Sequence, residues 1–246
     1  EQQCQQPQFS VTSLEEGQRV RITSPDGGYV RYNLNGGYGG EGGSITKDLT
    51  TPGTYNFYAW ETKSGYNDSP AITRSISVQK VGTPSISDVK YGANSAWVTI
   101  SGDGDIHYTM NGSNPNKNSS SYNGTIYLYD STTIKAMASR YGQVNSDVAS
   151  RYLSVTAPDT PTGLKLYNTK QKIAQGKTTT VRWNAMDRAT GYEARLYYNG
   201  EQVGRTYETN GTTAAFKLSD VGTYTIKVKA KNFKGSSAEC DGITVE

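Results

Sequence analysis

The chain has 246 residues, of which 34% are hydrophobic and 19% are charged, and its formal net charge at pH 7 is +3. The length allows one to three domains of ordinary size, while the composition excludes a coiled coil, a helical bundle and a disordered polyampholyte. Much of the apolar share is aromatic, with 19 Tyr against 4 Phe, beside 27 Gly. This composition is typical of short β-strands joined by polar turns.

The first part of the chain shows an early strand over residues 17–24, a Tyr-bearing strand from Tyr29, and a glycine-rich run over residues 36–43. The run lacks the Gly-Lys-Ser/Thr ending of a phosphate-binding loop. We expect a flexible tip here. A binding loop is the alternative, because Tyr38 lies within the run.

A later strand of the same part carries two outward aromatic side chains. Strand side chains alternate between faces, so Phe57 and Ala59 should face the core and Tyr58 and Trp60 should face outward. The equivalent outward positions of two later repeats hold Lys135 and Met137, and Lys227 and Lys229. Tyr58 and Trp60 are therefore candidates for stacking on a sugar or for contacting a partner protein. The alternative is that neighbouring side chains or the N-terminal tail cover them.

Three segments of the chain end in the same way, with a strand, a Gly-containing turn, a polar stretch and a closing strand. Pro-bearing linkers near residues 80 and 157 separate these segments. They occupy residues 55–78, 132–155 and 224–245. The first two align without a gap, so that Gly65 falls on Gly142 and Ser69 on Ser146. We predict an all-β chain of three consecutive immunoglobulin-like or fibronectin type III-like β-sandwiches arranged as a rod. The predicted domains cover residues 1–80, 81–156 and 157–246.

The middle part carries a recognisable pattern of turn and strand residues. The pattern comprises Ile106, Tyr108, Thr109, Asn111, Gly112, Ser113, Pro115, Tyr122, Gly124, Ile126, Leu128, Thr133, Ile134, Lys135, Ala136, Ala138, Gly142 and Ser146. In these residues, the segment 82–155 resembles the small immunoglobulin-like domain at the C-terminal end of chitobiases and β-hexosaminidases. That module also occurs in tandem in bacterial and phage surface proteins. The resemblance implies no catalytic residue.

The last part opens with Pro158 and Pro161 and places Trp183 and Tyr192 in successive strands, ahead of the stretch Leu-Ser-Asp-Val-Gly-Thr that leads to Tyr224. The segment 158–246 thereby resembles a fibronectin type III domain, in which such a stretch forms a tyrosine corner. In related proteins these domains act as spacers, adhesive modules or accessories near carbohydrate.

Two cysteines, Cys4 and Cys240, lie near opposite ends of the chain. Three sandwiches in a rod would span about 90 Å, whereas a disulfide needs Cα atoms within about 4.4–6.8 Å. We expect both thiols to be exposed, since Cys4 lies in a Gln-rich lead-in and Cys240 has the parity opposite to the core-facing Val245. They could link neighbouring molecules head to tail, and two unpaired thiols are the alternative.

Catalytic chemistry is not expected, because His107 is the only histidine and falls mid-strand. Neither cysteine lies in a zinc-ligand spacing, so no metal and no cofactor is predicted. The basic residues are scattered apart from a group near Lys229, which indicates one solvated strand face rather than a nucleic-acid site. No apolar run approaches the roughly 20 residues of a membrane span.

The sequence therefore predicts a non-catalytic extracellular or surface-exposed array, secreted with its signal removed, that serves adhesion, display or spacing. Its partner would be a protein or a glycan, and head-to-tail self-assembly is a further option. One alternative is a structural subunit of an extracellular filament or of a virion appendage. A second alternative is an accessory fragment of a glycoside-degrading enzyme.

Overall fold

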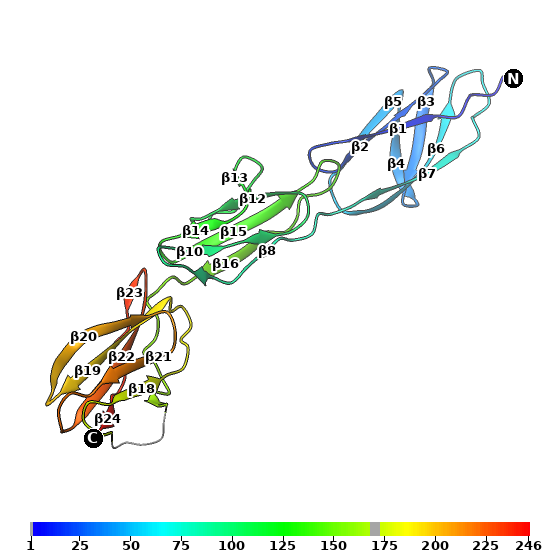
Figure 1. The fold of residues 1–246 in the computed structure, drawn as a ribbon. Helices are drawn as coiled ribbons and strands as arrows, with labels where there is room; N and C mark the ends of the chain where they lie inside the picture. The colour runs from blue at the N-terminus through cyan, green and yellow to red at the C-terminus, as the bar shows by residue number, and fades with distance from the viewer. Residues whose placement is uncertain (1, 168–172) are drawn as a thin grey trace. The chain divides into compact units, whose positions relative to one another are not determined.

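The computed structural model describes residues 2–167 and 173–246, and every helix or strand element in this part of the chain is a strand (Figure 1). The predicted all-β class is confirmed. No described helix is long and apolar enough to cross a membrane. No described sheet combines strands from more than one of the three predicted ranges. The boundaries near residues 80 and 157 and the rod arrangement stay predictions.

Contacts divide the chain into two compact units. The first comprises the described residues up to Ile86 with Ile100–Asn123 and Ile134–Arg151, and the second comprises Ser87–Thr99, Gly124–Thr133 and the described residues from Tyr152 on.

The first unit opens with two antiparallel sheets. The smaller sheet has the order β1-β2-β5, with β1 at Gln8–Ser13, β2 at Gln18–Thr23 and β5 at Ser44–Leu49. The larger sheet has the order β4-β3-β6-β7, with β3 at Tyr29–Leu34, β4 at Gly37–Gly42, β6 at Gly53–Thr62 and β7 at Ile72–Val78. Their shared core consists of Val20, Ile22, Val30, Tyr32, Leu49, Phe57, Ala59, Ile76 and Val78, joined by Val144.

Strand β6 shows how alternation in the sequence positions the core. Phe57 and Ala59 are fully buried, whereas Tyr58 is exposed and Trp60 is partly exposed. The predicted strand register is thus confirmed. Complete burial of a side chain such as that of Phe57 stabilises the fold by roughly 1.5–3 kcal/mol.

Most of the glycine-rich run forms strand β4, Gly37–Gly42, which corrects the expectation that it is a flexible tip or a loop. Asn35 and Gly36 both have positive φ, 50° and 82°, and form the two-residue turn between β3 and β4. This conformation suits a tight hairpin. A Cβ added at Gly39 would lie 2.3 Å from the ring of Tyr32. Glycine is needed there because the Tyr32 ring lies against the β4 backbone.

The remaining strands before residue 157 form three short antiparallel sheets. These sheets have the orders β11-β8, β13-β12-β15-β16 and β14-β10-β9. Their strands are β8 Ser85–Ile86, β9 Lys90–Tyr91, β10 Ala96–Val98, β11 Ile100–Ser101, β12 Asp105–Thr109, β13 Ser120–Ser121, β14 Ile126–Leu128, β15 Thr132–Ser139 and β16 Ala149–Leu153. Within the first unit, Val144 donates its N–H to the carbonyl of Gln79 and accepts from the N–H of Val81. The first linker is therefore held by backbone hydrogen bonds.

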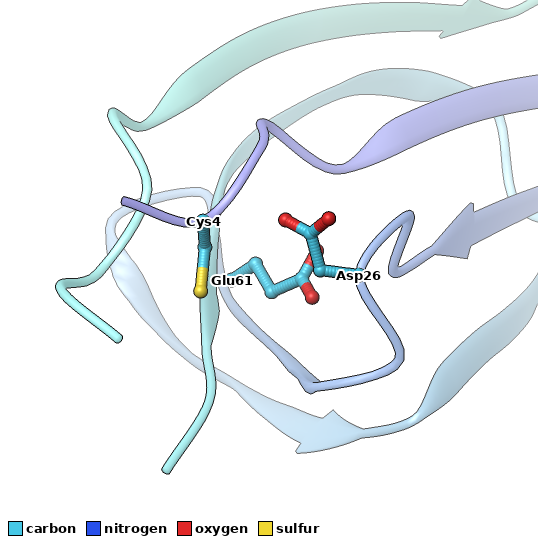
Figure 2. A group of neighbouring side chains, drawn as sticks. All are labelled: Cys4, Asp26 and Glu61. Atoms are coloured by element: carbon cyan, nitrogen blue, oxygen red, sulfur yellow. The ribbon is translucent and has the colours of Figure 1, made fainter. Parts of the chain in front are cut away.

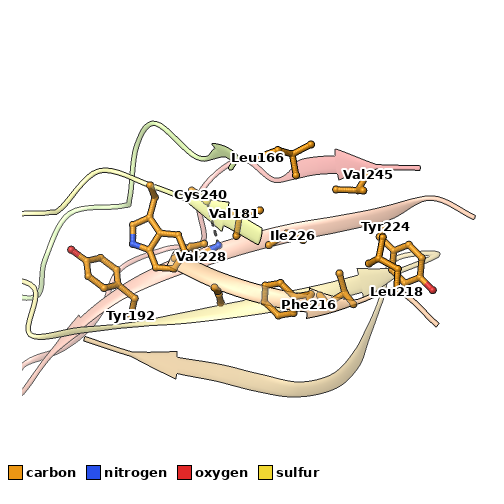
Figure 3. Packing of buried hydrophobic residues seen from close by; sticks show 14 of the residues in the cluster. Leu166, Val181, Tyr192, Phe216, Leu218, Tyr224, Ile226, Val228, Cys240 and Val245 are labelled. Carbon is orange, nitrogen blue, oxygen red and sulfur yellow. Dashed lines mark hydrogen bonds between the residues drawn. The ribbon is translucent and has the colours of Figure 1, made fainter. Parts of the chain in front are cut away.

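The second unit ends in a sandwich whose core is shown in Figure 3. One sheet has the order β17-β18-β21, with β17 at Lys165–Leu166, β18 at Thr178–Arg182 and β21 at Thr213–Lys217. The other has the order β20-β19-β22-β23, and β24 also pairs with β22. Its strands are β19 Gly191–Tyr198, β20 Glu201–Thr209, β22 Tyr224–Asn232, β23 Gly235–Ser236 and β24 Ile243–Val245.

This core confirms the residues on which the fibronectin resemblance depends. Trp183 is buried and packs edge-on against Tyr192, with ring centroids 5.5 Å apart. The buried hydroxyl of Tyr224 accepts from the N–H of Asp220 at 2.9 Å and donates to its carbonyl at 3.2 Å. The predicted tyrosine corner is present.

A serine follows the turn after the long strand in each repeat, and it is buried in the first two. Ser69 Oγ accepts from the N–H of Glu61, and Ser146 Oγ accepts from the N–H of Ala138 in the same way. Each serine N–H returns a bond to the carbonyl of that same strand residue. Ser237 makes the corresponding pair with Ala230. The aligned Ser69 and Ser146 thus satisfy backbone groups where the sheet ladder ends.

Replacing Ser69 or Ser146 by alanine should lower the free energy of unfolding by about 1–3 kcal/mol, because a buried backbone N–H loses its acceptor. Native-state hydrogen exchange at Glu61 and Ala138 would report the local loss of protection. Ser10→Ala, at an exposed position of β1, is the control and should shift stability by less than about 0.5 kcal/mol. Equal effects at all three positions would contradict this role for the buried serines.

Candidate functional site

The outer face of sheet β4-β3-β6-β7 carries the two aromatic residues singled out from the sequence. The ring centroids of Tyr58 and Trp60 are 5.9 Å apart and the planes are inclined by 59°. Tyr58 is 49% exposed, and Trp60 is partly exposed. The two rings therefore form an angled surface rather than a flat platform.

The strand register brings the third candidate, Tyr38, to the same face. Tyr38 on β4 lies opposite Asn33 on β3, which in turn lies opposite Tyr58 on β6. Tyr38 and Tyr58 are thus two strands apart, about 10 Å across the sheet. Tyr38 is 74% exposed. All three aromatic candidates share one accessible face.

Polar side chains lie between these rings, and sequence reasoning did not identify them. Arg31 on β3 lies opposite Trp60 on one side and Glu41 on the other. Its guanidinium Nε is 3.0 Å from Glu41 Oε2, and both side chains are about half exposed. Asn33 occupies the next outward position along β3. We name Asn33, Arg31, Glu41, Tyr38, Tyr58 and Trp60 the aromatic face. The alternation of polar residues along β3 was a signal for Arg31 and Asn33, but only the register shows which rings they neighbour.

The aromatic face combines two kinds of recognition group. Tyr and Trp rings offer apolar area with a polar edge, which suits the C–H faces of a pyranose ring. The Arg31–Glu41 pair and the Asn33 amide offer donors and acceptors that suit hydroxyl groups. Apolar rings with a few placed polar groups are typical of small-ligand sites.

Both cysteines are buried, so the expectation of exposed thiols was wrong. Cys4 is 3% exposed and Cys240 is 6% exposed, and both are free. Residues 237–242 lie outside any strand, so counting parity back from β24 gave the wrong face. The Cys240 sulfur instead accepts from the N–H of Val228 at 3.3 Å. Burial raises the pKa of the Cys240 thiol. An intermolecular disulfide through these thiols stays a prediction, and the burial of both cysteines does not support it.

Cys4 is fixed by the backbone on both sides. Its N–H donates to the carbonyl of Asn67, and the Asn67 N–H donates to the carbonyl of Gln2. This pairing places the Cys4 sulfur beside Asp26 and Glu61 (Figure 2). Burial raises the pKa of the Cys4 thiol, and the charges of Glu61 and Asp26 raise it further. No spacing motif connects these three residues, so sequence patterns do not reveal this cluster.

The other groups weighed from the sequence have structural roles. His107 is partly buried on β12, and its Nδ1 lies 3.1 Å from the carbonyl oxygen of Ser119. Three lysines of the basic group lie beside acidic side chains. Lys231 Nζ is 2.8 Å from Glu208, Lys227 Nζ is 3.8 Å from Glu239, and Lys234 Nζ is 2.6 Å from Asp130.

Comparison with known families finds two partial matches. Residues 98–153 match the family described as "Fn3 associated", and residues 138–245 match the family described as "Chitinase A, N-terminal domain". Neither match covers half of the chain. Together they support tandem immunoglobulin-like and fibronectin type III-like domains that resemble chitinase N-terminal domains. No curated protein matches the chain.

Among solved structures, the chain is similar to several fibronectin type III proteins. The FN1–FN3 domains of chicken CNTN1 are 14% identical with a TM-score of 0.34, over 99% of this chain and 98% of that one. The central fibronectin-III array of RIM-binding protein is 13% identical with a TM-score of 0.34, over 100% and 98%. The protein FN3tt is 22% identical with a TM-score of 0.29, over 37% and 92%.

Proposed function

We propose that this chain is a non-catalytic array of β-sandwich modules at an extracellular surface and that its aromatic face docks a glycan. The single observation that carries the proposal is the clustering of Tyr38, Tyr58 and Trp60 with exposed polar side chains on one sheet face. Adhesion, display and spacing are all served by such a docking surface.

The composition of the aromatic face favours a glycan over a large protein partner. Protein-binding patches are contiguous apolar areas of several hundred square ångströms. Here the exposed Arg31–Glu41 ion pair and Asn33 interrupt the aromatic area. An exposed ion pair contributes only about 0–1 kcal/mol to stability, so its groups can exchange partners with sugar hydroxyls at small cost. The inclined rings favour stacking of separate sugar units.

We propose a non-catalytic role because the candidate site lacks the groups that catalysis needs. The chain has one histidine, and its Nδ1 lies against a backbone carbonyl. General acid–base or nucleophilic catalysis needs groups positioned in pairs or triads. The candidate site consists of aromatic rings, one amide and one exposed ion pair, which bind rather than transform.

A second candidate function follows from one of the family matches. The match of residues 138–245 to the N-terminal domain of chitinase A favours an accessory part of a glycoside-degrading enzyme. Docking of a polysaccharide by the aromatic face would serve that role as well. The filament or virion-subunit alternative loses the covalent head-to-tail link that exposed thiols would have allowed, because Cys4 and Cys240 are buried.

Trp60→Ala should weaken retention on an insoluble polysaccharide by roughly tenfold, the upper scale of one specific aromatic contact of about 0.5–1.5 kcal/mol. The measurement is depletion of the intact chain from solution by chitin, cellulose and xylan in parallel. The free energy of unfolding should change by less than about 1 kcal/mol, because the ring faces outward.

Tyr127→Ala is the matched control, since Tyr127 is an exposed tyrosine on β14, outside the aromatic face. Its retention should equal that of the unmodified chain, while Tyr58→Ala should resemble Trp60→Ala. The proposal fails if none of the polysaccharides retains the chain, or if Trp60→Ala and Tyr127→Ala behave alike.

A further inference from the structure

Three segments of the first unit each place one metal-ligand side chain in the same small region near the N-terminus (Figure 2). Cys4 comes from the N-terminal segment, Asp26 from the turn between β2 and β3, and Glu61 from β6. The Cys4 sulfur and one carboxylate oxygen from each acid all lie within 4.8 Å of one another. This group is separate from the aromatic face.

A second observation points independently to a cation-binding role. Glu61 is fully buried, and its Oε1 accepts from Ser24 Oγ at 2.5 Å and from the N–H of Gly28 at 3.0 Å. Its Oε2 is also buried but has no hydrogen-bond partner among the described residues. A buried carboxylate oxygen without a partner is costly unless a charge or a donor compensates it. The same Glu61 carboxylate is a member of the cluster that holds the Cys4 thiol and the Asp26 carboxylate.

We propose that Cys4, Asp26 and Glu61 bind one divalent transition-metal ion of the zinc class, with the fourth coordination position open to water. Zinc accepts thiolate and carboxylate ligands together, whereas calcium and magnesium take oxygen ligands. On binding, the Cys4 thiol releases its proton to solvent and a metal–sulfur bond forms, so one cation replaces one proton.

The surroundings of the cluster suit this role. The Asp26 carboxylate is already oriented by Gln5, whose backbone N–H is 2.6 Å from Oδ2 and whose side-chain Nε2 is 3.0 Å from Oδ1. Such outer hydrogen bonds orient metal ligands. Lys63 Nζ donates to the backbone carbonyl of Asp26 at 2.8 Å and helps to hold the turn that carries this ligand.

Coordination requires a modest contraction of the cluster. Zinc bonds of about 2.0–2.3 Å place tetrahedral ligand atoms roughly 3.5 Å apart, so atoms up to 4.8 Å apart must approach by about an ångström. Rotation of the Cys4 and Asp26 side chains would supply this approach while the Cys4 backbone stays paired with Asn67 and Glu61 stays in β6. The bound ion would tie the N-terminal segment to the larger sheet.

The test is calorimetric titration of the intact, chelator-treated chain with zinc chloride alone. We expect one equivalent to bind, and both Cys4→Ser and Glu61→Gln to weaken affinity by at least roughly tenfold. Two controls should bind as the unmodified chain does. Cys240→Ser removes the other thiol, and Asp68→Asn removes a nearby exposed carboxylate.

Two further readouts do not depend on the variants' stability. Cobalt(II) added to the unmodified chain should give thiolate-to-cobalt charge-transfer absorption in the near ultraviolet. Zinc should also protect Cys4, but not Cys240, from alkylation as mapped by peptide mass. The proposal is overturned if the folded chain binds no zinc, or if Cys4→Ser and Glu61→Gln bind it as tightly as the controls do.

Discussion

Phe57→Ala is expected to lower the free energy of unfolding of the first sandwich by about 3–5 kcal/mol, the usual range for truncating a buried aromatic side chain. Phe57 is 0% exposed, and its ring lies 5.9 Å, centroid to centroid, from both Phe9 and Tyr32. These neighbours are held by the strands of two different sheets, so they cannot collapse fully into the cavity. Native-state hydrogen exchange of the β3 and β6 amides isolates this sandwich from the rest of the chain.

Tyr58→Ala is the matched control for Phe57→Ala, because it removes an aromatic ring from the next residue of the same strand. Tyr58 faces outward and is half exposed, so its removal should cost less than about 1 kcal/mol. The pair therefore tests the strand register directly. Equal losses, or a larger loss at Tyr58, would show that the register is displaced by one residue.

Gly17→Ala is expected to destabilise the first unit by about 2–6 kcal/mol, the sum of a left-handed backbone cost and an overpacking cost. Gly17 has a φ of +80°, and a Cβ there would lie 2.1 Å from the carbonyl oxygen of Leu49. That oxygen belongs to the backbone of β5 and cannot rotate away. The Gly17 N–H also donates to the carbonyl of Gln143, so the strain would extend to that contact.

Gly36→Ala separates the conformational cost from the steric one. Gly36 has a nearly identical φ of +82°, and a Cβ there would meet no described atom within 4 Å. Only the left-handed backbone cost of about 1–2 kcal/mol remains. Urea denaturation followed by hydrogen exchange at β5 compares the two variants. A Gly17→Ala variant no less stable than Gly36→Ala would contradict the close approach to Leu49.

Local sequence patterns predicted those features that depend on one strand or one turn. Alternation placed Phe57 inward and Tyr58 outward, because neighbouring side chains of a strand must face opposite sides. The resemblance of the stretch before Tyr224 to a fibronectin type III domain implied a tyrosine corner, and the structure shows it in the hydrogen bonds between the Tyr224 hydroxyl and Asp220. Alternation did not predict the burial of Met137, because facing outward does not determine what covers a side chain.

Features that depend on distant partners were not predicted. Cys4 is buried because residues 2–4 pair with Asn67 across the chain, and no local signal in a Gln-rich segment indicates that pairing. Cys240 is buried because a strand-parity argument does not hold where the strand is interrupted. The glycine-rich run has the composition of a loop, and only the packing of the Tyr32 ring against its backbone explains why glycines occur in this strand.

The residues of the two candidate sites also divide into those that local patterns predict and those that only the fold brings together. Comparison of the repeats singled out Tyr58 and Trp60, since aromatic residues replace lysine at outward positions. The cross-strand partners Arg31 and Glu41 required the register of three strands. The cluster of Cys4, Asp26 and Glu61 joins residues without any motif spacing, so only the fold reveals it.

The indole signals of the three tryptophans give the most direct test of glycan docking at the aromatic face. In nuclear magnetic resonance titrations with soluble oligosaccharides of chitin, cellulose and xylan, Trp60 should shift and saturate with at least one of them. Trp183, buried in another core, and Trp97, on β10, should keep their positions. Binding that moves Trp97 or Trp183 and leaves Trp60 unchanged, or no shift with any oligosaccharide, would contradict docking at this face.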